Sequence, residues 1–190
     1  MEPIFTLPYS EFCVAQQLAE LLPAKKGYSL YAPVSRHQPG VDLLIAKRSN
    51  QSIRVASIQV KSSRTYLNQT TTARTRKPFD YGTWFKNFEC SSEANFFCLV
   101  FLYPAVNKAQ RRELGTWWAP QIFLFSQKEM RQFLRSVGNV RGDRGSFFSF
   151  SFNKVGEAVL TVGDPKQRNR DFSKHLLSRR LDKLRRFLSA

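Results

Sequence analysis

Two neighbouring stretches, GVDLLIAK at residues 40–47 and IRVASIQVKS at residues 53–62, decide the fold of this chain. The first is a short apolar run typical of a buried strand. The second alternates, and one of its faces carries Ile53, Val55, Ser57, Gln59 and Lys61, because successive side chains of a strand point to opposite sides. Residues 48–51 (RSNQ) read as a turn. We therefore predict a β-hairpin over residues 41–62.

Periodicity extends this hairpin in both directions. Helices are predicted over 9–22, from Ser126 to about Val137 with Glu129 completing a capping box, and over 171–188; strands are predicted over 28–33, 94–103, 121–125, 147–152 and 158–162. The stretch 64–90 is long, polar and basic, which is typical of a functional or disordered segment. The predicted fold is α/β: a single domain with a mixed central β-sheet flanked by helices. Its core spans about 8–137, and the C-terminal strands and a basic helix span 146–189.

The charge of the chain points to a polyanionic partner. Thirty Lys and Arg oppose 14 Asp and Glu, a formal net charge of +16, and they are spread over most of the chain. DNA, RNA and an anionic membrane are the candidates, and a merely soluble basic protein is the alternative. No apolar run approaches the roughly 20 residues of a membrane span, and no secretory signal is visible. We therefore expect a cytoplasmic protein (nuclear in a eukaryote) without a membrane partner.

The cysteines and histidines give little chemistry. Cys13, Cys90 and Cys98 lack CxxC spacing, so we expect small core residues and no zinc site. His37 and His175 are the two histidines, too few for a histidine-based nuclease or a Ser-His-Asp hydrolase.

Three side chains of the hairpin suggest a metal site. Asp42 stands early in an apolar strand, where a bare carboxylate is costly unless it binds something. Gln59 and Lys61 share one face, and the hairpin places that face beside Asp42. Oxygen ligands of this kind hold the hard divalent cations used in phosphodiester cleavage. The alternative is that Asp42 pairs with a nearby Arg and that Gln59 and Lys61 lie on a solvent-exposed strand face.

A helix with Glu11, a strand, a strand with Asp42 and a strand with Gln59-Val60-Lys61 follow in this order. The pattern, in SEFCVAQQLAELL, GVDLLIAK and SIQVKSS, resembles the PD-(D/E)XK nuclease superfamily over about residues 8–62. The resemblance implies a restriction-endonuclease-like core and a Mg²⁺-dependent DNA endonuclease, with Mn²⁺ as a substitute. It also implies that Asp42, the Gln59 side-chain oxygen and the Val60 carbonyl bind the metal.

By the same resemblance, Lys61 orients the attacking water or neutralises developing charge, and Glu11 acts on the metal or its bound water. For Glu11, a helix N-terminal acid favoured by the helix dipole is the alternative. The sequence departs from the family pattern in two places. Gln59 stands where the pattern has an acid, and Val41 stands where the pattern has proline. Because an amide oxygen is neutral, Gln59 predicts weaker metal binding and puts a second metal in doubt.

The resemblance favours double-stranded or branched DNA as substrate. Candidates for phosphate contacts are Ser62, Ser63, Arg64, Arg74, Arg76 and Lys77. The C-terminal helix carries an apolar stripe of Phe172, Leu176, Leu177, Leu181, Leu184 and Leu188, and its basic face is either solvated or binds phosphates. Rival hypotheses are a catalytically inactive nucleic-acid-binding module on the same fold and a basic RNA-associated structural protein. A homodimer is a further hypothesis, since many such enzymes dimerise to cut two strands.

Overall fold

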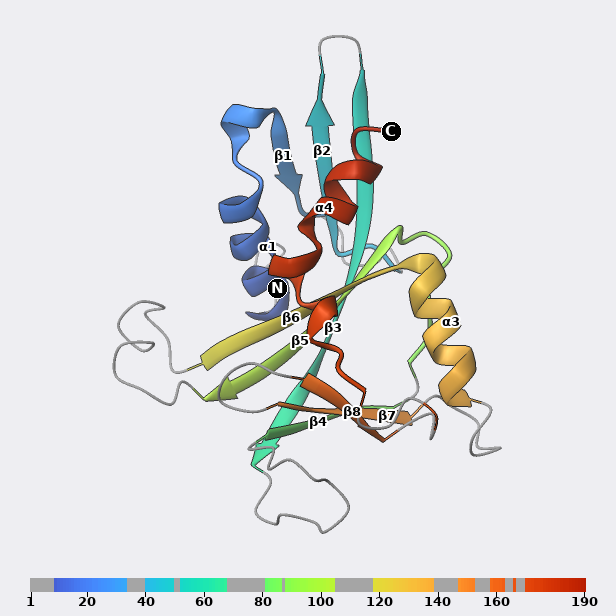
Figure 1. Ribbon diagram of the computed structural model, residues 1–190. Coiled ribbons are helices and arrows are strands. Elements are labelled where there is room, and N and C mark those ends of the chain that lie inside the picture. The colour runs from blue at the N-terminus through green and yellow to red at the C-terminus, as the bar shows by residue number, and fades with distance from the viewer. Residues whose placement is uncertain are drawn as a thin grey trace, which may run out of the picture.

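The computed structural model describes residues 9–33, 40–49, 52–67, 81–86, 88–104, 118–138, 147–152, 158–162, 166 and 170–190. It is an α/β protein with a mixed sheet and helices packed on it (Figure 1). The elements in chain order are α1 (Tyr9–Leu21), η1 (Ala24–Lys26), β1 (Tyr28–Tyr31), β2 (Leu43–Arg48), β3 (Ile53–Leu67), β4 (Tyr81–Lys86), β5 (Phe96–Pro104), β6 (Trp118–Ser126), α3 (Gln127–Gly138), β7 (Phe147–Phe152), β8 (Ala158–Val162), η2 (Ser173–His175) and α4 (Leu177–Phe187).

The long strand β3 belongs to two groups of strands. Its first part lies in the central five-stranded sheet, β1-β2-β3-β5-β6, where β3 and β5 are parallel and the other neighbours antiparallel. Its last residues pair with β4, which continues antiparallel to β7 and β8. In Figure 1, β3 runs from the hairpin with β2 down to β4. Ile58, in the middle of β3, is paired on both sides, with Leu43 of β2 and with Phe96 of β5.

The two faces of the central sheet are covered by different layers. On one face, Val14 and Leu18 of α1 and Leu181 of α4 pack with Ile58 and Val60 of β3. On the other face lies a core rich in phenylalanine, built from α3 and the β4-β7 strands; its fully buried members include Phe97, Phe101, Phe123, Phe125, Phe148 and Phe150. Many of these rings meet edge to face, the arrangement that aromatic quadrupoles favour.

Most predicted elements are present, with shifted ends. β2 and β3 pair antiparallel, as the predicted hairpin requires. All six residues of the predicted apolar stripe in the C-terminal segment are buried. Ser126 and Glu129 form one half of the predicted capping box: the Ser126 N–H donates to Glu129 Oε2 over 2.9 Å, and the Ser126 hydroxyl donates to the same oxygen over 2.8 Å. The three cysteines are free thiols; two are buried and Cys90 is half-buried.

Two segments differ from what the sequence alone suggests. The polar stretch 64–90 contains the end of β3 and the whole of β4, because pairing with β7 compensates for weak local patterning. The C-terminal helix is not continuous over 171–188. Leu176 leaves helical geometry at ψ 134° and forms a bridge to Phe123 on β6, so α4 begins only at Leu177. In the described part of the chain, no helix has the length and apolarity to cross a membrane.

Candidate functional site

Asp42 is fixed where the chain enters β2. Gly40, two residues earlier, has φ +90°, and a β-carbon there would clash with the Ser91 hydroxyl. The backbone N–H of Asp42 donates to the Ile58 carbonyl over 2.9 Å. Its carboxylate accepts the Val60 N–H at Oδ2 over 2.6 Å. The Asp42 carboxylate thus takes the place of a backbone carbonyl as the acceptor for the Val60 N–H, which ties Asp42 to the middle of β3.

Gln59 is the cross-strand neighbour of Asp42. Leu43 pairs with Ile58, so one further step along the antiparallel register sets Asp42 opposite Gln59. Gln59 is only 7% exposed, and its Oε1 accepts no hydrogen bond from any residue that the structure describes. A buried carbonyl oxygen without a partner is costly, by roughly 1–3 kcal/mol. A ligand at this oxygen would remove that cost.

Lys61 lies two residues further along β3, on the same face as Gln59, and its side chain is exposed. The register therefore places Asp42 beside Gln59, and alternation places Lys61 on the Gln59 face of β3. The N–H of Val60 is directed to the Asp42 side of β3, and in an extended strand the carbonyl of a residue leaves on the same side as its N–H. Two side-chain oxygens and one backbone oxygen are grouped at the start of β2.

Burial and the Asp42 charge both act on a neighbouring thiol. Cys98 pairs with Val60 across the β3–β5 ladder and is fully buried. Burial raises the pKa of the Cys98 thiol, and the Asp42 carboxylate raises it further, so the thiol stays protonated. The carboxylate therefore lies next to the buried core, where the low dielectric strengthens its attraction to a cation.

A polar clamp that the sequence analysis missed fixes β3 against β5 near this site. The Asn95 side-chain oxygen accepts the Ser57 N–H over 2.9 Å, and the Asn95 N–H donates to the Ser57 carbonyl over 3.0 Å. The Ser57 hydroxyl also donates to the Glu93 carbonyl over 2.6 Å. Ser57 stands two residues before Gln59, so the clamp sets the register of the strand that carries the site. Glu93 and Asn95 follow Ser57 by 36 and 38 residues, so no local sequence pattern indicates this contact.

Glu11 approaches the sheet from the other side. It is half-buried in the first turn of α1 and shares a helix face with Val14 and Leu18, which pack on Ile58 and Val60. Gln59 lies on the opposite face of β3 from these two residues. The structure thus groups Asp42 with Gln59 and Lys61 more directly than with Glu11.

The predicted phosphate-contacting residues fall into four groups. Ser62 is exposed. The Ser63 hydroxyl donates to the Trp84 carbonyl, so it joins β3 to β4. Arg64 continues β3, paired with Leu102, while Arg74, Arg76 and Lys77 lie outside the described residues, as does His37.

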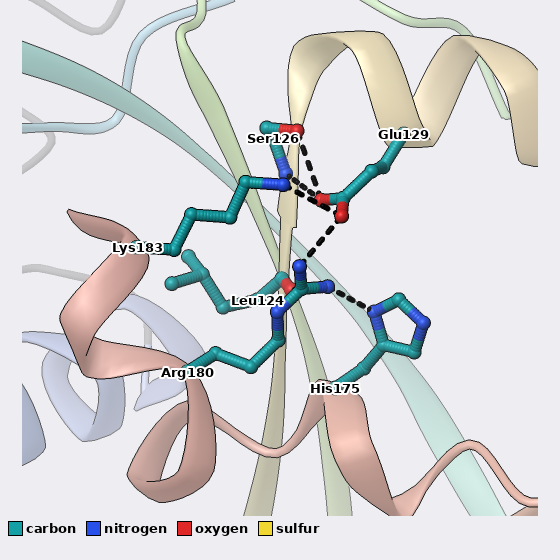
Figure 2. A network of polar contacts seen from close by, with 6 residues as sticks. All are labelled: Leu124, Ser126, Glu129, His175, Arg180 and Lys183. Atoms are coloured by element: carbon teal, nitrogen blue, oxygen red, sulfur yellow. Dashed lines mark hydrogen bonds and ion pairs between the residues drawn. The ribbon is translucent and has the colours of Figure 1, made fainter. Parts of the chain in front are cut away.

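A second polar group, also missed by the sequence analysis, joins α3 to α4 (Figure 2). Glu129 Oε1 pairs with Arg180 over 2.5 Å and with Lys183 over 2.6 Å. Arg180 also lies 2.6 Å from His175 Nδ1. Burial alone would raise the pKa of Glu129, but hydrogen bonds from Lys183, Arg180 and Ser126 outweigh burial and lower it to about 2. Burial, and then the Arg180 charge, lower the pKa of His175 to about 4.

The described residues contain no group of three or more His, Cys, Asp or Glu that could hold a metal ion. A cation at Asp42 would therefore depend on neutral oxygens for its remaining protein ligands. Comparison with protein-family models, with curated proteins and with solved structures finds no match for this chain.

Proposed function

We propose that the protein is a metal-dependent DNA endonuclease with a restriction-endonuclease-like core. The observation that carries the proposal is the buried Gln59 oxygen, which lacks a hydrogen-bond partner among the described residues and belongs to the residue opposite Asp42 in the strand register. The net charge of +16 supports a polyanionic substrate. The order of elements supports the family resemblance: α1 with Glu11, β1, then β2 preceded by Asp42, then β3 with Gln59-Val60-Lys61.

The donor set fits Mg²⁺, with Mn²⁺ as a substitute, because all its members are oxygens. Asp42 would bind through the carboxylate oxygen that Val60 does not use, and Gln59 and Val60 would bind through their carbonyl oxygens. With one carboxylate, the site should bind a single metal weakly. When bound, the metal would polarise the scissile phosphate and lower the pKa of an attacking water.

The chain's own residues supply orientation and charge. Lys61, an exposed ammonium on the same strand face, would hold a phosphate oxygen or the attacking water and neutralise charge that develops in the transition state. Glu11 would act at the rim of the site, on a metal-bound water. Ser62 and Arg64 continue from Lys61 and would contact neighbouring phosphates. Double-stranded or branched DNA is the proposed substrate.

Supercoiled-plasmid cleavage with Mg²⁺ or Mn²⁺ titration tests this proposal. Wild type should cut, and Asp42→Ala and Lys61→Ala should not. Glu89→Ala and Lys25→Ala are matched controls, because both side chains are exposed and lie outside the site. Equal cleavage by all five proteins would exclude the site. Competition with RNA at fixed salt, and mass measurement in solution, would test the preference for DNA and the homodimer.

The second candidate is a nucleic-acid-binding module that has lost catalysis, and the neutral Gln59 favours it. Gln59→Glu separates the two functions, because it restores the second carboxylate. A nuclease should then reach half-maximal cleavage at several-fold lower Mg²⁺. A module that binds DNA in EDTA but cuts with neither protein at any metal concentration would be the inactive descendant.

A further inference from the structure

A basic hollow lies between η2, α4 and the start of α3. It encloses about 810 Å³. Five of its lining side chains are cationic: Lys174, Arg179, Arg180, Lys183 and Arg186. Figure 2 shows two of these side chains, Arg180 and Lys183, reaching from α4 toward Glu129 on α3.

The acidic side chains of the hollow are already engaged. Glu129 is held by Ser126, Arg180 and Lys183, and Asp182 pairs with Arg185 over 3.2 Å. Five cations against these two acids leave a formal excess of three positive charges in the lining. His175, in the same wall, has its pKa lowered by burial and by Arg180 to about 4, so at neutral pH it adds no charge. The excess is therefore constant over the physiological range.

The cations form two tiers. Arg180 and Lys183 are partly buried and anchored on Glu129. Lys174, Arg179 and Arg186 are exposed, and none has an ion pair within 4 Å among the residues that the structure describes. The inner tier holds the shape of the hollow, and the outer tier has donors to offer an anion. Guanidinium groups bind phosphate oxygens in bidentate geometry, which favours a phosphate over an apolar ligand.

The spacing of the cations fits a chain of phosphates better than a single one. Arg179 and Arg186 lie seven residues apart on one face of α4, a stripe of about 10 Å at 1.5 Å per residue, with the anchored Lys183 between them. Along one DNA strand a phosphate recurs about every 3.4 Å of helix axis, and because the strand winds around that axis its successive phosphates lie further apart, so the stripe spans about two. A free phosphate ion would use only part of it.

We propose that this basic hollow binds the phosphate backbone of a polynucleotide, as a second contact surface built from different elements than the Asp42 site. The identity of the polyanion rests on the proposed function, and its position rests on the arrangement of α4. The surface reads no bases, because its donors are flexible cations on an exposed helix face. It supplies affinity and a salt dependence.

Binding of a labelled 20-base-pair duplex in EDTA tests the inference without any cleavage. The test variant is the triple substitution Lys174→Gln, Arg179→Gln and Arg186→Gln, which spares the Glu129 anchors. The matched control is Lys25→Gln, Lys26→Gln and Arg48→Gln, which removes the same charge from exposed residues around η1 and the end of β2. We expect the test variant to bind 10- to 100-fold more weakly, and its slope of log K against log salt to fall by about three. The control should change affinity less than threefold.

Three results would overturn the inference: equal weakening in both triple variants, no weakening in the test variant, or displacement of the duplex by 10 mM inorganic phosphate at constant ionic strength. Loss of binding to anionic phosphatidylserine vesicles with unchanged duplex binding would assign the surface to a membrane instead. Because the binding assay contains EDTA and no metal, its result does not depend on whether the protein cleaves DNA. If the protein cleaves DNA but the test variant binds the duplex normally, the basic hollow is refuted and the nuclease proposal is not.

Discussion

Two polar groups in this protein are handled in opposite ways. In the α3–α4 network, Glu129, Arg180 and His175 are partly or mostly buried, and each has close polar partners. At the start of β2, Gln59 is equally hidden, yet its oxygen has no partner among the described residues. Buried polar groups are normally paired, so the first arrangement stabilises the fold by itself, while the second is completed only by something added. The contrast separates a structural network from a candidate site.

The largest expected effect comes from Asp42→Asn. The amide keeps an oxygen that can accept the Val60 N–H, but it loses the only carboxylate of the group. Because a bound metal contributes several kcal/mol to the transition state, we expect cleavage to fall about a thousandfold or more. Thermal unfolding should change little. A parallel loss of stability and activity would instead make Asp42 a structural residue like Glu129.

Arg180→Met should be the most damaging substitution for stability in the α3–α4 network. It leaves the Glu129 and His175 groups short of a partner. We expect a loss of about 2 kcal/mol in urea unfolding, less than for a fully buried ion pair, because both partners of the pair are partly exposed. The neighbouring exposed Arg179→Met should cost no more than about 0.5 kcal/mol. Equal midpoints for the two variants would show that the network contributes nothing.

The same network predicts a pH dependence. Histidine in the unfolded chain has a pKa near 6.5, whereas His175 in the folded protein has a pKa of about 4. Between these values the unfolded chain binds a proton that the native protein does not, so the free energy of unfolding falls as pH drops. We expect a fall of about 2 kcal/mol from pH 7 to pH 5. In His175→Phe this component should disappear; an identical slope in both proteins would contradict the assignment.

Glu129 adds a second, lower window. Its pKa is lowered to about 2 in the folded protein, against 4.5 for an unperturbed group, so its contribution is present above pH 4.5 and is lost as pH falls toward 2. The two windows barely overlap, which allows the histidine component to be measured alone above pH 5.

The smallest effect has the opposite sign. Gln59→Met replaces the buried amide by an apolar side chain of similar length, which removes an unsatisfied oxygen. We expect stability to stay equal or rise by about 1 kcal/mol while metal-dependent cleavage is lost. Destabilisation as large as that of Arg180→Met would mean that Gln59 has a structural partner, and the comparison between the two polar groups would then fail.

Local patterns were enough to predict the elements that build the candidate site. The alternation over 53–62 correctly placed Gln59 and Lys61 on one face, and the short turn placed Asp42 beside them. Those features depend only on period and neighbouring residues. The break at Leu176 and the strand β4 could not be predicted in this way, because both are decided by partners far along the chain, Phe123 on β6 and the strand β7.

Charge pairing was the least predictable feature. Glu129 was correctly read as a capping residue, but its partners Arg180 and Lys183 follow more than 50 residues later and looked like any cations off an apolar stripe. That the Gln59 oxygen has no partner among the described residues is likewise a property of packing and leaves no trace in the sequence. Residue types suggested which chemistry is feasible, and only the three-dimensional arrangement distinguished satisfied groups from unsatisfied ones.

The bridge between Leu176 and Phe123 covers an edge of the central sheet. β6 pairs on one side with β5, and its other side would be a nine-residue template for strand addition by another molecule. The segment leading into α4 crosses this edge and buries Phe172 and Leu176 against the phenylalanine layer. Truncation before Asp171 would therefore open a long hydrophobic edge and promote aggregation, so an affinity tag belongs where it does not disturb this cover.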